Sequence, residues 1–297
     1  MRILHIITID SGGAGSQSRM LHKSLLKKDI ESDMLTFIKN TNTERIHLFA
    51  HIFSKGSLVR NIIHYYNFLP SFFREKILMA GKNKEHEIFT NPSSCIDVTK
   101  HPLYEKADLI HLHFCAYFLD WHSFFTKNKK PVVITLHDMN AVTGGCHYSE
   151  DCNGYMEECR NCPQLRGSLI RNAAENNLRK KAALIKNTEN IAFITPSRWM
   201  EDCTKRSVAA KNKFVKTIRY GIDSNRFKRF DKSESRKKLG LPLNKQIILY
   251  IADSFSRGIK GGELFFESLK HLKEKEKKML LMVGSGRKFR KDLLPVE

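Results

Sequence analysis

Short runs of apolar residues recur along the chain, and most of them are continuous rather than alternating with polar residues. Continuous runs bounded by turn residues are typical of parallel strands that are buried on both faces of a sheet. We therefore expect strands at residues 3–7, 109–112, 132–136, 191–194, 215–218, 247–251 and 279–283.

Helical patterns lie between several of these runs. Residues 17–28 repeat Met20, Leu21, Ser24 and Leu25 at steps of three and four, and residues 262–273 show the same spacing. Strands that alternate with helices predict an α/β protein with parallel sheets.

The length of 297 residues suggests about two domains. The first is expected over residues 1–225. Residues 226–244 are strongly charged and are predicted to be a linker with a short helix. Residues 245–297 form a strand–helix–strand segment, which is either the start of a second, incomplete domain or a piece that packs onto the first. No internal repeat is present.

Residues 45–90 differ from the rest because they mix aromatic with basic residues. This composition is that of a basic, amphipathic pair of helices on a surface. An ordinary helical subdomain whose aromatic rings face a core has the same composition, and the sequence does not separate the two.

The net charge is 51 − 31 = +20, which indicates an anionic partner such as nucleic acid, a membrane surface or a phosphorylated substrate. With 41% hydrophobic residues, the chain is not a disordered one. No run is long enough for a signal peptide or a membrane span, which predicts a cytoplasmic location with reduced thiols. Its seven cysteines are then expected to be metal ligands or buried thiols.

Glycines follow the first expected strand in the stretch SGGAGS. Gly12 and Gly13 stand where a strand turns into a helix, so backbone amides there can face an anion or a sugar. The spacing does not match the dinucleotide fingerprint. Tight packing of the helix on the strand is the alternative explanation.

His137 and Asp138 directly follow the apolar strand at 132–136. Ligands of open parallel sheets bind beyond the carboxyl ends of the strands, so this pair is expected at the edge of a cleft, on the same rim as Gly13. The alternative is a structural histidine bonded to the backbone.

Four cysteines lie close together in the loop 146–162. Cys146, Cys152, Cys159 and Cys162 are able to close around one tetrahedral zinc ion, with His147 as a spare ligand. Four thiolates leave no open coordination position, so the zinc would be structural. A redox-labile pair is the other possibility.

The segment TLHDMNAVTGGCHYSEDCNGYMEECRNCPQL, with its His-Asp-Met and its cysteine-rich loop, closely resembles bacterial glycosyltransferase family 4 enzymes of capsule, O-antigen and exopolysaccharide synthesis. Other parts resemble the family in the same order along the chain: MRILHII with SGGAGS, ADLIHLHF, FITPSRWM, RYGIDSNRF, and ILYIADSFSRGIKGGELFF with LLMVGSG.

The resemblance implies a GT-B fold, in which two Rossmann-like domains bind acceptor and donor. It implies a retaining hexosyltransferase that moves a sugar from a nucleotide-sugar donor to a lipid-linked or polysaccharide acceptor, with no cofactor required for the chemistry. His137 and Asp138 would be catalytic. Gly12 and Gly13 would lie near the donor phosphates or the acceptor, and Arg257 and Lys260 would neutralise the donor diphosphate.

The chain departs from the family in having Asn140 and Val142 after His-Asp-Met, and in the position of Arg257. The family's Glu-x7-Glu motif, which holds the donor, would lie beyond residue 297. A non-catalytic remnant that binds a sugar or a partner is therefore the alternative function. A zinc-stabilised nucleic-acid-binding protein is disfavoured, because the positive charges are spread along the chain and no binding module is present. We expect the enzyme at the cytoplasmic face of the cell membrane, bound to its anionic surface.

Overall fold

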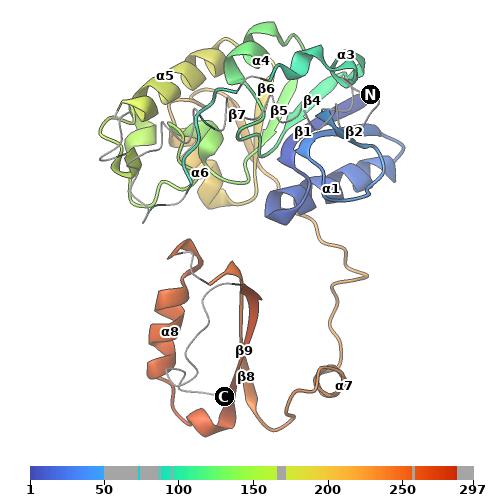
Figure 1. The fold of residues 1–297 in the computed structure, drawn as a ribbon, viewed down its shortest axis with the longest axis vertical. Helices are drawn as coiled ribbons and strands as arrows, with labels where there is room; N and C mark the ends of the chain where they lie inside the picture. Colours follow the sequence, from blue (N-terminus) through green and yellow to red (C-terminus); the bar gives the residue numbers. More distant parts are fainter. Residues whose placement is uncertain are drawn as a thin grey trace. The chain divides into compact units, whose positions relative to one another are not determined.

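A sheet of seven parallel strands forms the frame of the first of two units into which the chain divides, Met1–Ile222 and Asp223–Glu297 (Figure 1). The computed structural model describes residues 1–49, 73, 86, 88–94, 96–165, 172–255 and 258–285. Most of the basic, aromatic segment 45–90, and the whole of Arg257, thus lie outside the described residues. Within the described ranges, no helix is long and apolar enough to cross a membrane.

The strands of the first unit are arranged in the order β3-β2-β1-β4-β5-β6-β7. Their bounds are β1 (Arg2–Ile9), β2 (Glu31–Ile38), β3 (Ile46–Leu48), β4 (Leu109–Leu112), β5 (Val132–Thr135), β6 (Ile191–Thr195) and β7 (Phe214–Thr217). The helices are α1 (Gly12–Leu26), α3 (Pro102–Lys106), α4 (Trp121–Lys127), α5 (Ala173–Lys186) and α6 (Arg198–Arg206). Short 3-10 turns lie at Val98–Lys100, Asn140–Val142, Gly154–Met156 and Pro163–Leu165.

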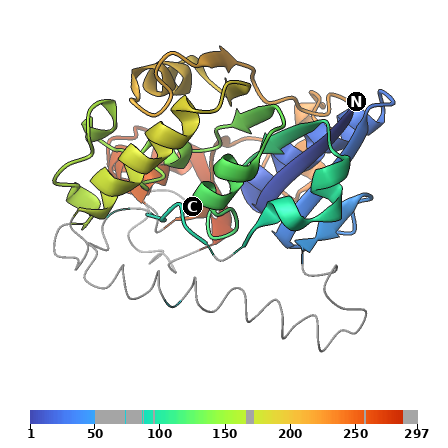
Figure 2. The same cartoon turned by 90° about the horizontal axis from the view of Figure 1, so that it is seen from above.

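The main core lies on one face of this sheet. Leu4, Ile6, Ile110 and Ile134 point to that face and pack against apolar side chains of α3, α4, α5 and α6. Figure 2 shows α3, α4 and α5 side by side along the sheet. The opposite face has a much smaller apolar cluster around Ile7, which α1 covers through Ala14.

The second unit contains α7 (Lys232–Lys238), β8 (Gln246–Ser254), α8 (Gly262–Lys270) and β9 (Lys278–Ser285), with 3-10 turns at Gly258–Lys260 and Lys275–Lys277. Strands β8 and β9 pair in parallel. The short helix predicted within residues 226–244 is α7, and Asp231 caps it by accepting a hydrogen bond from the Glu234 amide at 2.8 Å.

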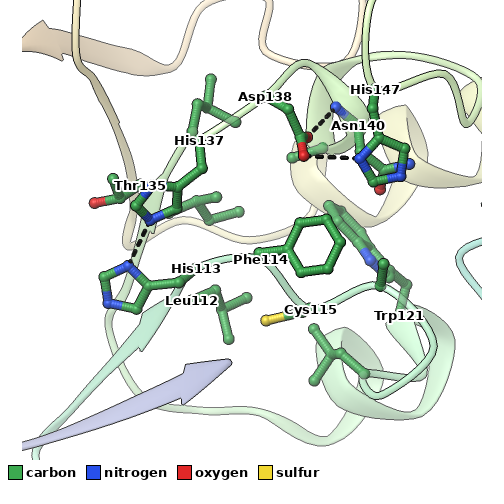
Figure 3. Close-up of a pocket in the computed structure, with 15 residues that line it drawn as sticks. Leu112, His113, Phe114, Cys115, Trp121, Thr135, His137, Asp138, Asn140 and His147 are labelled. Carbon is green, nitrogen blue, oxygen red and sulfur yellow. Dashed lines mark hydrogen bonds and ion pairs between the residues drawn. The ribbon is translucent and has the colours of Figure 1, made fainter. Parts of the chain in front are cut away.

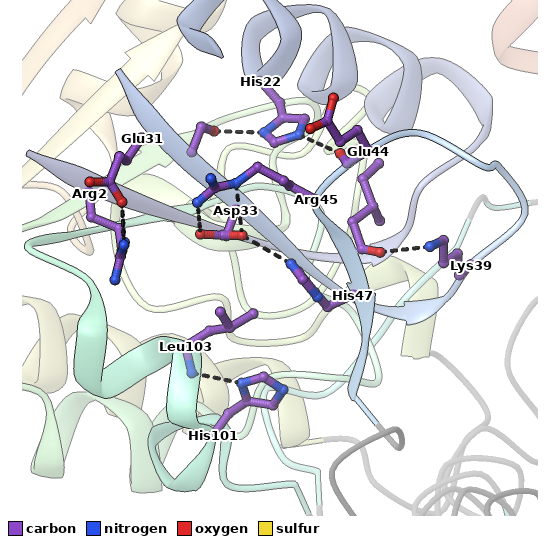
Figure 4. A network of polar contacts seen from close by, with 12 residues as sticks. Arg2, His22, Glu31, Asp33, Lys39, Glu44, Arg45, His47, His101 and Leu103 are labelled. Carbon is purple, nitrogen blue, oxygen red and sulfur yellow. Dashed lines mark hydrogen bonds and ion pairs between the residues drawn. The ribbon is translucent and has the colours of Figure 1, made fainter. Parts of the chain in front are cut away.

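All seven predicted strands are confirmed with small shifts of their ends, and so is the α/β class. Strands β2 and β3 were missed because polar residues interrupt their apolar runs. Asp33 of β2 is buried, and it is paired with Arg45 at 2.7 Å and with His47 at 3.0 Å (Figure 4). Burial alone would raise the pKa of Asp33, but the hydrogen bonds from these two partners outweigh it and lower the pKa to about 2.

The helix predicted at 17–28 exists, but its buried face is different. Gly15, Ser18 and His22 are buried, whereas Leu21 is 37% exposed. His22 is bonded to the Ser32 hydroxyl at 2.7 Å and to the Glu44 carbonyl at 3.0 Å. The helix therefore packs through a face of small and polar side chains. The spacing of apolar residues does not identify such a face.

Candidate active site

The carboxyl edge of the seven-stranded sheet carries the polar residues singled out above. Strand β1 pairs with β2 on one side and with β4 on the other, so the strand order reverses there. Open α/β sheets bind ligands outside the carboxyl ends of the strands at such a point. The ends of β1, β4, β5 and β7 therefore define the candidate site.

His137 lies just beyond β5 and is held on both ring nitrogens. Its Nε2 is 3.1 Å from His113 Nδ1, and its Nδ1 is 2.7 Å from the Tyr220 hydroxyl (Figure 3 shows the first of these contacts). The Tyr220 ring also stacks on the imidazole, with the centroids 5.5 Å apart. Both partners are side chains, so His137 does not match the alternative of a histidine bonded to the backbone.

Burial lowers the pKa of His137 to about 4, although the nearby Asp138 carboxylate opposes this shift. Burial also raises the pKa of Tyr220 to about 12, and Asp138 adds to that effect. At neutral pH the imidazole is thus uncharged and the phenol is protonated. The pair is able to orient a ligand through hydrogen bonds but supplies no positive charge.

A small cavity lies next to His137, lined also by Phe114, Cys115, Leu119 and Trp121 (Figure 3). The space open to the centres of water molecules is about 30 Å³, which is room for about two waters. A sugar does not fit inside this cavity. Substrate contacts of His137 are therefore expected at its exposed rim rather than in its interior.

Asp138 points away from His137, toward the loop that follows (Figure 3). Its carboxylate accepts a hydrogen bond from the Asn140 amide at 2.9 Å and lies 2.7 Å from His147 Nδ1. His147 is buried and its Nε2 is 3.0 Å from the Thr90 hydroxyl. Asp138 thus holds the loop, and His147 is not oriented as a spare zinc ligand, which corrects that expectation.

A buried lysine also stabilises the 3-10 turn Asn140–Val142. Lys181 of α5 is fully buried and donates hydrogen bonds to the carbonyls of Asn140 at 2.5 Å and Thr143 at 3.2 Å. Its ammonium lies 5.2 Å from the Trp121 ring centroid. Burial lowers the pKa of Lys181 to about 8. The departure Asn140 has a structural role of its own, since its side-chain amide donates to the Thr90 hydroxyl at 3.0 Å and to the Gly145 carbonyl at 2.8 Å.

The glycine loop divides into two parts with different roles. Gly12 has a φ of +72° and, like Gly13, has no atom within 4 Å of the position where a Cβ would stand. A Cβ at Gly15 would lie 2.4 Å from the Asp10 carbonyl carbon. Tight packing of α1 on β1 thus explains Gly15 but leaves the backbone of Gly12 and Gly13 open to a ligand. Neither Gly12 nor Gly13 contributes to the lining of the cavity beside His137.

The four cysteines of the loop 146–162 line a single small cavity. Its space for water centres is about 20 Å³, enough for one small ion or water. Burial raises the pKa of Cys146 to about 12 and that of Cys159 to about 11. All four cysteines are in the described part of the chain, and no three of their sulfur atoms lie within 4.8 Å of one another. A tetrahedral zinc site needs sulfurs about 3.8 Å apart, so the loop would have to contract around the ion.

In the second unit, Lys260 ends the 3-10 turn before α8. Its ammonium is 3.7 Å from an Asp253 carboxylate oxygen, and its carbonyl accepts a hydrogen bond from Tyr250. Gly284 of β9 lies so near β8 that a Cβ would stand 1.8 Å from the Ala252 carbonyl oxygen. This close approach, together with a φ of +153°, requires glycine at position 284.

The structure adds residues that the sequence reasoning missed, above all His113 and Tyr220. The sequence held a signal for His113, because His111 and His113 are two positions apart in the apolar stretch 109–114, which begins with β4. Polar residues at a period of two inside a buried strand mark one chemically distinct face. Tyr220 had no such signal, since it lies in a loop 83 positions from His137.

No protein-family model matches the chain, and no curated protein matches its sequence. Solved structures do match it. One is a crystal structure of WaaG, a glycosyltransferase involved in lipopolysaccharide biosynthesis, with a TM-score of 0.52 and 14% sequence identity. The match covers 96% of this chain and 64% of that chain, so this chain spans less than two thirds of its length. The likeness confirms the predicted GT-B type of fold.

Proposed function

We propose that this protein is a retaining glycosyltransferase of the family 4 type, a hexosyltransferase that transfers a sugar from a nucleotide-sugar donor to a lipid-linked or polysaccharide acceptor in cell-surface glycan synthesis. The observation that carries the proposal is the placement of His137, at the carboxyl edge of a GT-B sheet and held on both sides by His113 and Tyr220. The solved neighbour, described as a glycosyltransferase, supports the same class.

In this proposal, His137 lies against the transferred sugar and positions it through its backbone and through van der Waals contacts of its neutral imidazole, whose two nitrogens are held by His113 and Tyr220. Asp138 acts through the loop that it holds, and so it is a positioning residue rather than a catalytic one. The open amides of Gly12 and Gly13 approach the donor phosphates or the acceptor. Arg257 and Lys260 neutralise the charge on the departing nucleoside diphosphate, for which no metal ion is required.

Donor hydrolysis and sugar transfer by the purified chain would test this function. The assay uses a panel of uridine and guanosine diphosphate sugars, with a membrane extract as the source of acceptor. We expect turnover, and we expect His137→Ala to lower it about 100-fold, the usual effect of removing one preorganised polar contact. His122→Ala is the matched control, because His122 is exposed on α4.

Turnover that is unchanged in His137→Ala would remove His137 from the mechanism. Binding of the donor without turnover would favour the alternative of a sugar-binding remnant. Failure of every nucleotide sugar to bind would exclude the transferase.

We also propose that the cysteines of the loop 146–162 bind one structural zinc ion. Support comes from the single cavity that Cys146, Cys152, Cys159 and Cys162 share, and from the hydrogen bond of 3.4 Å that the Gly154 amide donates to the Cys152 sulfur. A positive ion there would favour the thiolates that burial alone disfavours. The ion would order the loop that follows Asp138.

Metal analysis of the purified chain should find one zinc per molecule. Replacing Cys159 and Cys162 together by serine should abolish it, and chelation should lower the free energy of unfolding by about 3 kcal/mol or more, the stabilisation from a ligand at roughly 100 times its Kd. Cys115→Ser is the control, because Cys115 lies in the other cavity. Zinc-free protein in which these thiols form a disulfide on mild oxidation would support the redox-labile pair instead.

Association with an anionic membrane surface at the cytoplasmic face is part of the proposal, and nucleic acid is not an expected partner. Beyond the segment 45–90, the described residues include an exposed stretch of the same composition, Arg226–Phe230, whose Phe227 and Phe230 rings are both more than half exposed. Lys and Arg near an anionic leaflet contribute about 1 kcal/mol each. Sedimentation with anionic but not neutral vesicles, run on the assayed protein, tests it.

A further inference from the structure

Three histidines and a tyrosine form one continuous hydrogen-bonded chain from the interior of the sheet to the site. His5 Nδ1 of β1 lies 2.9 Å from His113 Nε2, His113 Nδ1 lies 3.1 Å from His137 Nε2, and His137 Nδ1 lies 2.7 Å from the Tyr220 hydroxyl. His5 is fully buried, whereas Tyr220 is 39% exposed. The chain thus connects a buried end with an accessible end.

The buried end of the chain is unsatisfied. His5 Nε2 has no hydrogen-bond partner among the described residues. The His22 ring lies at a centroid distance of 6.0 Å, but both of its nitrogens are already bonded to Ser32 and Glu44. His5 Nε2 therefore ends the chain either as a buried N–H without an acceptor or as a buried lone pair without a donor.

Neutral imidazole has one N–H and one lone pair, so the direction of one link sets the direction of every other link. If Tyr220 donates to His137, the donors run inward and the chain ends in a buried, unpaired N–H at His5. If His5 donates to His113, the donors run outward and only a lone pair is left unpaired. Orphaned buried N–H groups are rarer in proteins than under-used acceptors, which favours the outward direction.

We propose that the chain runs outward, with His5, His113 and His137 each protonated on Nδ1, and that Tyr220 thereby presents its hydroxyl hydrogen to an acceptor oxygen of the bound donor substrate. His137 Nδ1–H then donates to the Tyr220 oxygen, and the Tyr220 hydroxyl hydrogen has no acceptor among the four linked side chains. Tyr220 becomes a ligand-binding residue, and His5 and His113 become positioning residues that act through it.

The protonation states of the groups agree with this arrangement. Burial lowers the pKa of His5 and His113 far below its ordinary value and that of His137 to about 4, so the rings stay neutral. Burial keeps Tyr220 protonated by raising its pKa to about 12. The phenol is therefore available as a donor throughout the neutral range.

A metal site is the competing explanation, because nitrogens of His5, His111 and His113 lie within 4.8 Å of one another. The rings of His5 and His111, however, are each stacked on or nearly parallel to that of His113 rather than arranged radially. The planes of His5 and His111 are inclined by 33°, and those of His111 and His113 by 25° at a centroid distance of 4.2 Å. Imidazoles that share one ion point their lone pairs at a common centre, which nearly parallel, stacked rings do not do.

Nitrogen-15 NMR of the histidine rings in the unmodified full chain tests the direction without relying on activity. We expect the Nδ1–H tautomer at His5, His113 and His137, with the His137 signal identified by its shift in Tyr220→Phe. The Nε2–H tautomer at these three rings would overturn the proposal, and so would a metal-bound nitrogen shift that a chelator abolishes. This arm is independent of the proposed function.

The role of Tyr220 rests on the proposed function and is tested by binding. Tyr220→Phe should weaken binding of the nucleotide sugar about 10-fold, the loss of a single good hydrogen bond. Tyr104→Phe is the matched control, since the Tyr104 hydroxyl is bonded to Asn128 near the amino end of β4. If the contacted oxygen belongs to the diphosphate, the affinity for the free nucleoside diphosphate should fall by the same factor. If it belongs to the sugar, only the affinity for the nucleotide sugar should fall.

Unchanged affinity in Tyr220→Phe, with the donor bound by the unmodified chain, overturns the proposed role of Tyr220 and leaves the transferase intact. Failure of the unmodified chain to bind any nucleotide sugar defeats the proposed function and, with it, the ligand assigned to Tyr220. The tautomers then report on the direction of the chain alone.

Discussion

The free energy of unfolding is expected to fall steeply as the pH drops from about 6.5 toward 4. Among the described residues, burial lowers the pKa values of six histidines, His22 among them, and for five of them the lowering is large enough to keep the ring neutral in the folded protein. These five are His5, His101, His111, His113 and His137. In the unfolded chain they take up protons near pH 6.5. Below that pH the unfolded state binds more protons than the folded state, so the stability is fully present above pH 6.5 and is lost on acidification.

The size of this effect compares with the whole stability of a protein. A histidine with an unfolded pKa of 6.5 that stays neutral when folded costs about 1.4 kcal/mol at pH 5.5, so five cost up to about 7 kcal/mol. Folded proteins are stable by only about 5–15 kcal/mol. We therefore expect acid unfolding centred between about pH 4 and 6, above the pH near 2 at which the Asp33 carboxylate protonates.

Urea unfolding at a series of pH values would measure this slope. His101→Asn should make it shallower by about one proton, near 1.4 kcal/mol per pH unit, while preserving the cap. His101 caps α3 by accepting a hydrogen bond from the Leu103 amide at 3.1 Å, and asparagine is a good cap. His122→Asn, at an exposed position, should leave the slope unchanged. Stability that does not vary between pH 7 and 5 would contradict the prediction.

Gly15→Ala is expected to destabilise the first unit strongly. The new methyl group would stand 2.4 Å from the Asp10 carbonyl carbon and 2.8 Å from the Ile9 carbonyl oxygen, which are backbone atoms and do not swing aside. The helix α1 would have to lift from β1, which uncovers the cluster around Ile7. Overpacking of this kind costs about 3 kcal/mol or more.

Gly13→Ala is the matched control, two positions away in the same helix. No atom lies within 4 Å of its Cβ position, and alanine favours a helix over glycine by about 1 kcal/mol. Its stability should be equal or higher. Thermal unfolding of both variants decides the matter: equal melting temperatures for the two would show that α1 does not depend on the close approach at Gly15. In Gly13→Ala, lost donor or acceptor affinity without lost stability would support a ligand near that backbone.

The strands at the centre of the sheet were predictable because their signal is local. Residues 109–112 and 132–136 are apolar apart from one uncharged polar residue each, His111 and Thr135, and such a run indicates a strand buried on both faces. The position of His137 followed from this, since the residue after a parallel strand must lie at the carboxyl edge. Strand β2 was not predicted, because Asp33 interrupts its apolar run. The charge of Asp33 is compensated by Arg45 and His47 only in the folded structure.

By itself, the sequence determined the α/β class, the seven apolar strands and the rim on which His137 lies, since each depends on residues adjacent in the chain. The tertiary structure alone decided what each polar group meets. Asp138 points toward His147, and His5, His113, His137 and Tyr220 are linked by hydrogen bonds. Gly15 lies against the backbone of β1, whereas Gly13 has open space at its Cβ position. The physical reason is that a hydrogen bond depends on where two atoms lie in space, and the four linked side chains come from inside β1 and from beyond the ends of β4, β5 and β7.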